Sequence, residues 1–150
     1  MKNKRLLVAA IIGIATLFLA AGLYAGSTVP EVIKMQNDYE HTKGIVEFSH
    51  AKHATEYKAG CGDCHHDENN KPLADLKEGD SVKKCIECHN KPGEKPKGKK
   101  APKLSKSEEL QYHAEALHEN CKGCHKDYNK KNKTKAAPTT CTKCHPKTKK

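Results

Sequence analysis

Four copies of a five-residue motif, Cys-x-x-Cys-His, together use all eight cysteines of the chain. The cysteines are Cys61 and Cys64, Cys85 and Cys88, Cys121 and Cys124, and Cys141 and Cys144, and the histidines that follow them are His65, His89, His125 and His145. Two thiols at this spacing can each form a thioether to one vinyl group of a haem, and the next histidine then lies under the iron as its proximal ligand. The sequence therefore predicts four covalently bound haem c groups.

Two other uses of paired cysteines must be weighed against this. Two Cys-x-x-Cys pairs could form a zinc site with four thiolate ligands, and eight cysteines in an exported chain could form four disulfides. Zinc does not require a histidine after each second cysteine, and repeated Cys-x-x-Cys-His units are not a disulfide pattern. Both alternatives also leave the other histidines unexplained.

Six further histidines could supply the sixth ligand of each iron: His41, His50, His53, His66, His113 and His118. Met35 is the one methionine besides the initiator, so six-coordinate irons would be bis-histidine, with at most one exception. Imidazole on both faces does not raise the reduction potential as methionine does, which predicts low potentials. No iron would then have an open position for a substrate.

The spacing of these histidines distinguishes the stronger candidates. His50 and His53 share one face of a helical turn, and His66 points away from the adjacent proximal His65. His113 and His118 both precede the third motif and remain alternatives for one iron, with His118 preferred because it lies closer to the motif. His41 has no such context and is read as a loop histidine.

Short elements are expected to position these ligands. Residues 32–35 and 45–48 are β-prone runs that could pair as an antiparallel ribbon. Ser105 and Glu108 fit a capping box, and apolar residues at helical spacing predict a helix over residues 106–120. The proline- and lysine-rich residues 91–103 are expected to form a mobile loop, and only short segments are expected after Cys124, with a loop over residues 129–140.

Composition places these elements in one small exported domain. Residues 1–25 resemble a signal peptide, with a basic start and about 19 uncharged, mostly apolar residues, although an uncleaved membrane anchor remains an alternative. Residues 26–150 form the predicted tetrahaem domain, which contains no tryptophan and belongs to a chain of mean hydropathy −0.86. Haem macrocycles would have to supply its core. The expected location is the periplasm.

Charge is unevenly distributed along the chain. Residues 26–90 hold eight lysines and twelve acids, whereas residues 121–150 hold ten lysines and one acid. Such a basic region can be a solvated surface or a docking patch that raises encounter rates with an acidic partner. Export and the few aromatic residues argue against nucleic acid as that partner.

The order of the motifs is distinctive: Phe48-x-His50-x-x-His53 comes first, then Cys61-x-x-Cys64-His65-His66, then three more haem motifs with a histidine ahead of the third. In this order the chain resembles the tetrahaem cytochrome c3 family, the class III c-type cytochromes of sulfate- and metal-reducing bacteria. The resemblance covers residues 32–150. It implies a small, mostly irregular α domain with a short N-terminal β ribbon, wrapped around four closely packed haems. The implied axial pairs are His65 with His50, His89 with His66, His125 with His53, and His145 with His118.

Two departures from that pattern accompany the resemblance. Well-known members have a wider Cys-x-x-x-x-Cys-His at the second and fourth sites, whereas this chain has the short form at all four. The segment between the second and third motifs is also long and rich in lysine, proline and glycine.

The expected function is electron transfer in anaerobic respiration, such as sulfate reduction, and not enzymatic catalysis. The resemblance suggests hydrogenase, formate dehydrogenase or a membrane redox complex as acidic partners, with the lysine-rich end around the fourth motif as the entry point. Membrane contact is expected only if the N-terminal segment is uncleaved. The alternatives are a small multihaem reductase of metal ions or oxyanions, and a subunit of an extracellular haem filament.

Overall fold

The computed structural model describes residues 30–77 and 79–147, and the proposed signal peptide lies outside this part. Strand β1 (Ile33–Lys34) pairs antiparallel with β2 (Glu47–Phe48), with Ile33 opposite Phe48. The backbone N–H of Met35 donates to Val46 O at 2.9 Å and continues the pairing by one residue. The predicted N-terminal ribbon is confirmed.

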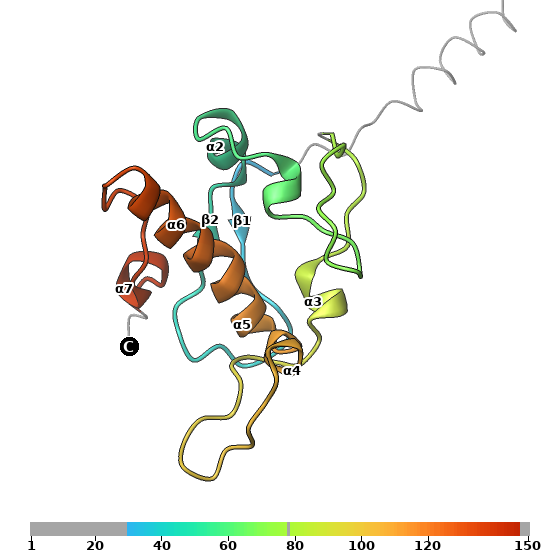
Figure 1. Ribbon diagram of the computed structural model, residues 1–150, viewed down its shortest axis with the longest axis vertical. Helices are drawn as coiled ribbons and strands as arrows, with labels where there is room; N and C mark the ends of the chain where they lie inside the picture. The colour runs from blue at the N-terminus through green and yellow to red at the C-terminus, as the bar shows by residue number, and fades with distance from the viewer. Residues whose placement is uncertain (1–29, 78, 148–150) are drawn as a thin grey trace, which may run out of the picture.

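The other elements are short helices joined by irregular chain (Figure 1). They are α2 (His50–Thr55), the 3₁₀ turn η1 (Cys61–Asp63), α3 (Cys85–Cys88), α4 (Lys106–Leu110), α5 (His113–Leu117), the π-helix η2 (His118–Gly123), α6 (Cys124–Lys131) and α7 (Cys141–Cys144). The small, mostly helical and irregular fold class is therefore confirmed.

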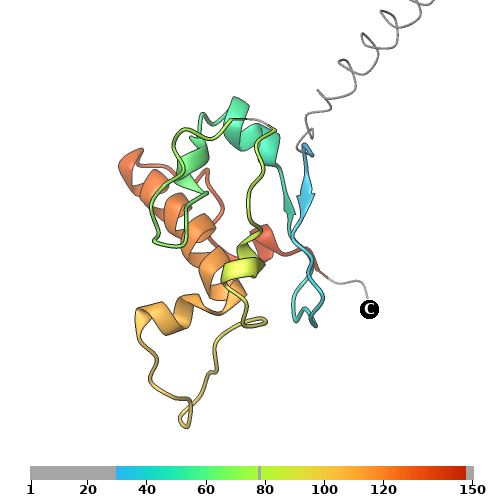
Figure 2. The same ribbon diagram turned by 90° about the vertical axis from the view of Figure 1, so that its right-hand side faces the viewer.

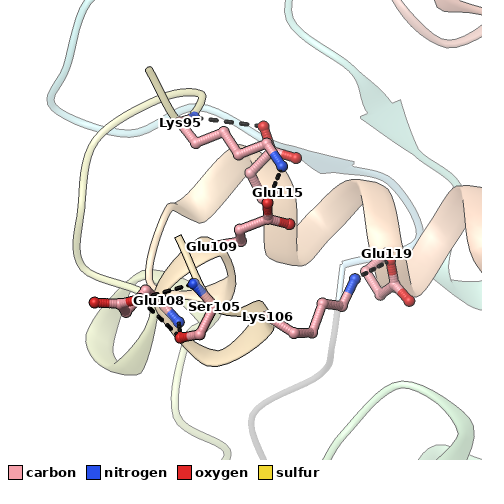
Figure 3. A network of polar contacts seen from close by, with 7 residues as sticks. All are labelled: Lys95, Ser105, Lys106, Glu108, Glu109, Glu115 and Glu119. Atoms are coloured by element: carbon pink, nitrogen blue, oxygen red, sulfur yellow. Dashed lines mark hydrogen bonds and ion pairs between the residues drawn. The ribbon is translucent and has the colours of Figure 1, made fainter. Parts of the chain in front are cut away.

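Helix α4 begins where the sequence predicted, at the capping box. The Ser105 hydroxyl accepts from the N–H of Glu108 at 3.3 Å, and the Glu108 carboxylate accepts from the N–H of Ser105 at 2.7 Å (Figure 3). This arrangement satisfies donors that a helix N-terminus leaves unpaired. The same figure shows Lys95 and Lys106, whose side chains pair with acidic residues of the helices that follow.

A single helix over residues 106–120 was a wrong prediction, because the chain breaks at Tyr112. Tyr112 adopts an extended conformation (φ −78°, ψ 124°) and forms a parallel bridge with Lys91. The N–H of Lys91 donates to Gln111 O, and the N–H of His113 donates to Lys91 O, both at 2.9 Å. These long-range bonds replace helical ones, and helical spacing alone cannot reveal them.

The helical path then continues beyond the predicted end. From α5 it passes through η2 into α6 and ends at Lys131, so the expectation of only short segments after Cys124 was wrong. No glycine or proline interrupts residues 124–131. Lys130 and Lys131 lie in the last turn of α6, where positive charge favours the helix dipole. Figures 1 and 2 show this run as the longest helical stretch of the described chain.

The described residues contain no buried hydrophobic side chain, and His113, 2% exposed, is the one buried residue among them. A folded domain of this size normally buries aliphatic and aromatic side chains. The side chains of the described residues therefore do not form the core that would hold the short helices together.

The segment 91–103 begins against α5, where Gly93 O accepts from the N–H of Ala114 at 2.9 Å, and then forms a loop that projects away from the helices in both views (Figures 1 and 2). Two glycines in this segment, Gly93 (φ 66°) and Gly98 (φ 109°), adopt left-handed conformations that side chains disfavour. In residues 30–77 and 79–147 no helix is long and apolar enough to cross a bilayer.

Candidate haem-binding site

Each Cys-x-x-Cys-His motif lies on a helical turn. Turn η1 and helices α3 and α7 begin at the first cysteine of their motifs, and α6 begins at the second cysteine of the third. In three motifs the N–H of the histidine donates to the carbonyl of the first cysteine, at 2.7–2.9 Å. Residues three apart on such a turn share a face, so both thiols of a motif can reach one ligand.

The motifs converge in space although they span 85 positions of sequence. Burial first, and then the negative charges that nearby Cys64, Cys85 and Cys144 can carry, raise the pKa of Cys121 to about 11. One thiol of the third motif thus lies near a thiol from each of the other three. In addition, the Asn120 side-chain amide donates to Cys64 O at 3.0 Å and ties the first motif to η2.

Each proximal histidine faces a second histidine from elsewhere in the chain. The ring centroids of His50 and His65 lie 6.4 Å apart, those of His66 and His89 5.9 Å, those of His53 and His125 6.1 Å, and those of His118 and His145 6.3 Å. A metal–imidazole bond is about 2 Å long, so two rings that bind one iron from opposite sides have centroids about 6 Å apart. All four pairs fit that spacing.

Backbone carbonyls set which ring nitrogen of these histidines is free. The Nδ1 atoms of five of them lie within hydrogen-bond distance of a carbonyl oxygen: His53 of Ser49 O, His66 of Asp67 O, His89 of Leu110 O, His125 of Pro138 O and His145 of Gly44 O. A carbonyl only accepts, so in each case Nδ1 carries the proton and donates. This leaves the Nε2 lone pair free for a metal and fixes the ring orientation.

No carbonyl in residues 30–77 and 79–147 accepts from the His65 ring, but the environment of His65 favours the form that binds metal. Burial, and the nearby His50 and His66, lower its pKa. A neutral imidazole is the form that coordinates iron. Its distal candidate, His50, starts α2 three residues before His53, and the Phe48 ring packs against both, with centroids 5.9 and 4.7 Å away.

His118 and His113, the two alternatives for one iron, have different surroundings. His118 is the residue that faces His145, whereas the Nδ1 of His113 lies 2.8 Å from the Tyr39 hydroxyl. A backbone hydrogen bond from Gly93 also reaches that hydroxyl. His113 is thus engaged with a tyrosine, whereas His118 faces a proximal histidine with ring centroids 6.3 Å apart, so the geometry favours His118.

His41 lies in the irregular segment between β1 and β2. Its ring stacks on Tyr39 with centroids 4.6 Å apart, and its Nε2 lies within hydrogen-bond distance of both the N–H and the carbonyl oxygen of Asn37, at 3.2 and 3.3 Å. The backbone therefore uses the nitrogen that a metal would need. This environment matches a loop histidine.

The described residues fit haem better than the alternatives raised by the sequence. None of the eight cysteines is in a disulfide. Residues 30–77 and 79–147 contain no group of three or more His, Cys, Asp or Glu side chains that could hold a metal, as a zinc site would require. Haem is a large apolar group whose iron takes two axial ligands. It fits the paired histidines, the paired thiols on one face and the absence of buried hydrophobic side chains among the described residues.

Sequence reasoning missed the backbone groups that orient the histidines, because carbonyls leave no trace in residue type. Gly44 is the clearest example. Its carbonyl accepts from His145 at 2.8 Å, and a Cβ on Gly44 would clash with Pro146 O. The N-terminal segment therefore packs closely against the fourth motif. A glycine in a polar stretch was the available signal, but nothing in the sequence said what it contacts.

Comparison with known proteins agrees with this geometry. No curated protein matches the chain significantly. The model of the class III cytochrome c family matches residues 27–145, which include all four motifs and all ten histidines. The chain therefore belongs to the class III cytochrome c family, multihaem proteins that transfer electrons through covalently bound haem c.

Proposed function

We propose that this chain is a periplasmic, low-potential electron carrier with four bis-histidine haems, and that it is not an enzyme. The observation that carries the proposal is the set of four histidine pairs, each with ring centroids 5.9–6.4 Å apart. Every proximal histidine has a partner at the spacing of two axial ligands. No iron then keeps a free position for a substrate.

Each part of the chain has a defined role in this proposal. The haems supply reversible one-electron iron chemistry. The eight cysteines attach them, the proximal histidines and their partners His50, His53, His66 and His118 hold the irons, and five backbone carbonyls fix the ligand rings. Imidazole ligation on both faces keeps the potentials low.

The partner surface is proposed at the C-terminal end. The eight lysines between residues 121 and 147 are all exposed: Lys122, Lys126, Lys130, Lys131, Lys133, Lys135, Lys143 and Lys147. None of these eight lysines forms an ion pair among the described residues. A field of this sign steers acidic proteins toward the fourth motif. Hydrogenase, formate dehydrogenase or a membrane redox complex of anaerobic respiration, such as sulfate reduction, are the proposed partners.

The visible spectrum of the dithionite-reduced holoprotein, before and after carbon monoxide, tests this function. An unchanged low-spin spectrum means that every iron keeps two protein ligands. A shift in about a quarter of the haem absorbance would reveal one open iron in four and would favour a metal-ion or oxyanion reductase instead. Mass spectrometry of the intact holoprotein counts the attached haems in the same sample.

A further inference from the structure

One helical run carries ligands for two irons in this structure. His118 faces His145 of the fourth motif, and His125, seven residues later, faces His53 of α2. The two partners come from opposite ends of the described chain. In both views α2 and α7 lie apart, beside different parts of the run (Figures 1 and 2).

A regular α-helix could not send these two histidines in different directions. Each residue turns an α-helix by about 100°, so seven residues bring the chain to within about 20° of two full turns. His118 and His125 would then lie on one face. Both rings would then point the same way, although their partners His53 and His145 come from parts of the chain that lie apart.

The segment between them is a π-helix, η2 (His118–Gly123). In a π turn the backbone hydrogen bonds join residues five apart, so the turn holds one residue more than an α turn. The α-helices on either side are therefore oriented as if the run were one residue shorter. The seven positions from His118 to His125 then rotate the chain as six would in an α-helix, which separates the two side chains by roughly 120° around the helix axis. We propose that η2 is a positioning element that absorbs one residue, so that one helix provides a ligand to each of two irons.

Side chains of η2 contact two other parts of the molecule. Asn120 donates to Cys64 O in the first motif at 3.0 Å, and Glu119 accepts from Lys106 of α4 at 2.7 Å (Figure 3). The Lys106–Glu119 pair is about 60% exposed on each side and contributes little, since surface pairs are screened by water. The bond from Asn120 therefore matters more for the orientation of the segment. Glu119 lies outside the Cys121-x-x-Cys124 motif, and its loss removes this exposed ion pair.

The inference predicts an asymmetry between removing and adding one residue in η2. Deletion of Glu119 removes the extra residue and restores a regular α-helix with the same angle between the two histidines. Insertion of one alanine after Glu119 places the two histidines eight positions apart, and with one π turn they again lie within about 20° of each other around the helix axis. The deletion should keep its ligands, whereas the insertion should lose one.

The experiment uses the full chain, matured with its haems, and measures the low-spin fraction of the reduced spectrum and its change with carbon monoxide. The deletion variant should match the parent, and the insertion variant should shift about a quarter of its haem absorbance. Glu119→Gln is the matched control, because it removes the ion pair but keeps the length, and it should also match the parent. Loss of low-spin haem in the deletion variant, or none in the insertion variant, overturns the inference.

This inference rests on the proposed ligand assignment, and His118→Ala separates the two. If His118→Ala leaves the spectrum unchanged, the assignment itself fails. If His118→Ala shifts about a quarter of the haem absorbance but deletion and insertion behave alike, the assignment stands and η2 has no positioning role. The deletion variant decides the question even if the insertion variant does not mature.

Discussion

His113 and His118 lie five positions apart, and their substitution should produce opposite kinds of damage. His113 is 2% exposed, and its Nδ1 forms a hydrogen bond with the Tyr39 hydroxyl at 2.8 Å. His113→Ala leaves that hydroxyl without this partner in a partly buried place, which costs about 1–3 kcal/mol of unfolding free energy. For a domain of this size, each kcal/mol lowers the melting temperature by roughly 4 °C, so a fall of roughly 4–12 °C is expected.

The visible spectrum of the haems should stay unchanged in His113→Ala although the melting temperature falls. Because His113 is not a ligand in the proposed assignment, His113→Ala keeps all four haems low-spin. His118→Ala removes the ring opposite His145 and shifts about a quarter of the haem absorbance, one iron in four. Thermal melts and reduced spectra with carbon monoxide on the two variants measure both effects. A low-spin loss in His113→Ala but not in His118→Ala would refute the ligand choice.

The stability effect of His113 should also depend on pH. Burial first, and then the nearby His89 and His41, lower the pKa of His113 below its usual 6.5. The folded protein therefore holds His113 neutral, while the unfolded chain takes up a proton below pH 6.5. The contribution of His113 is fully present above pH 6.5 and is lost as the pH falls below it. The difference in melting temperature between the parent and His113→Ala should narrow toward pH 5, and a gap that widens would contradict this sign.

Three further predictions concern the fourth motif and the core. Gly44→Ala places a Cβ in a clash with Pro146 O, so it should displace the carbonyl that holds His145 and alter about a quarter of the haem spectrum. Gly60→Ala, whose Cβ has its nearest contact at 3.5 Å, should leave the spectrum unchanged. Neutralising three lysines of the C-terminal end, Lys143, Lys147 and Lys149, should slow reduction of the protein by an acidic partner about 10-fold at low ionic strength. The salt dependence of the reduction rate, measured by stopped flow, should become weaker. Unchanged kinetics would count against docking at this end. A chain with all eight cysteines changed to alanine should show no cooperative thermal unfolding by circular dichroism, because the described residues bury no hydrophobic side chain, and a sharp transition would show that the polypeptide has its own core.

The sequence determined the chemistry of this protein because that chemistry depends on covalent spacing. Four Cys-x-x-Cys-His motifs define where haem can attach, and local patterns also placed the ribbon at Ile33–Lys34 and Glu47–Phe48 and the capped helix start at Ser105. The axial pairs came from the family resemblance. The residues alone left His113 and His118 as alternatives, since both precede the same motif at short range.

The tertiary structure decided what long-range contacts control. Lys91 pairs with Tyr112 and breaks the predicted helix, and this break leaves Leu110 O to accept from His89 Nδ1. Tyr39, 74 positions from His113 in sequence, forms a hydrogen bond with the Nδ1 of that histidine, whereas His118 faces His145. The π-helix and the carbonyls that orient the ligands belong to the backbone, whose conformation and partners depend on distant segments. Residue types specify which atoms can bind iron, and only the folded backbone decides which way they point.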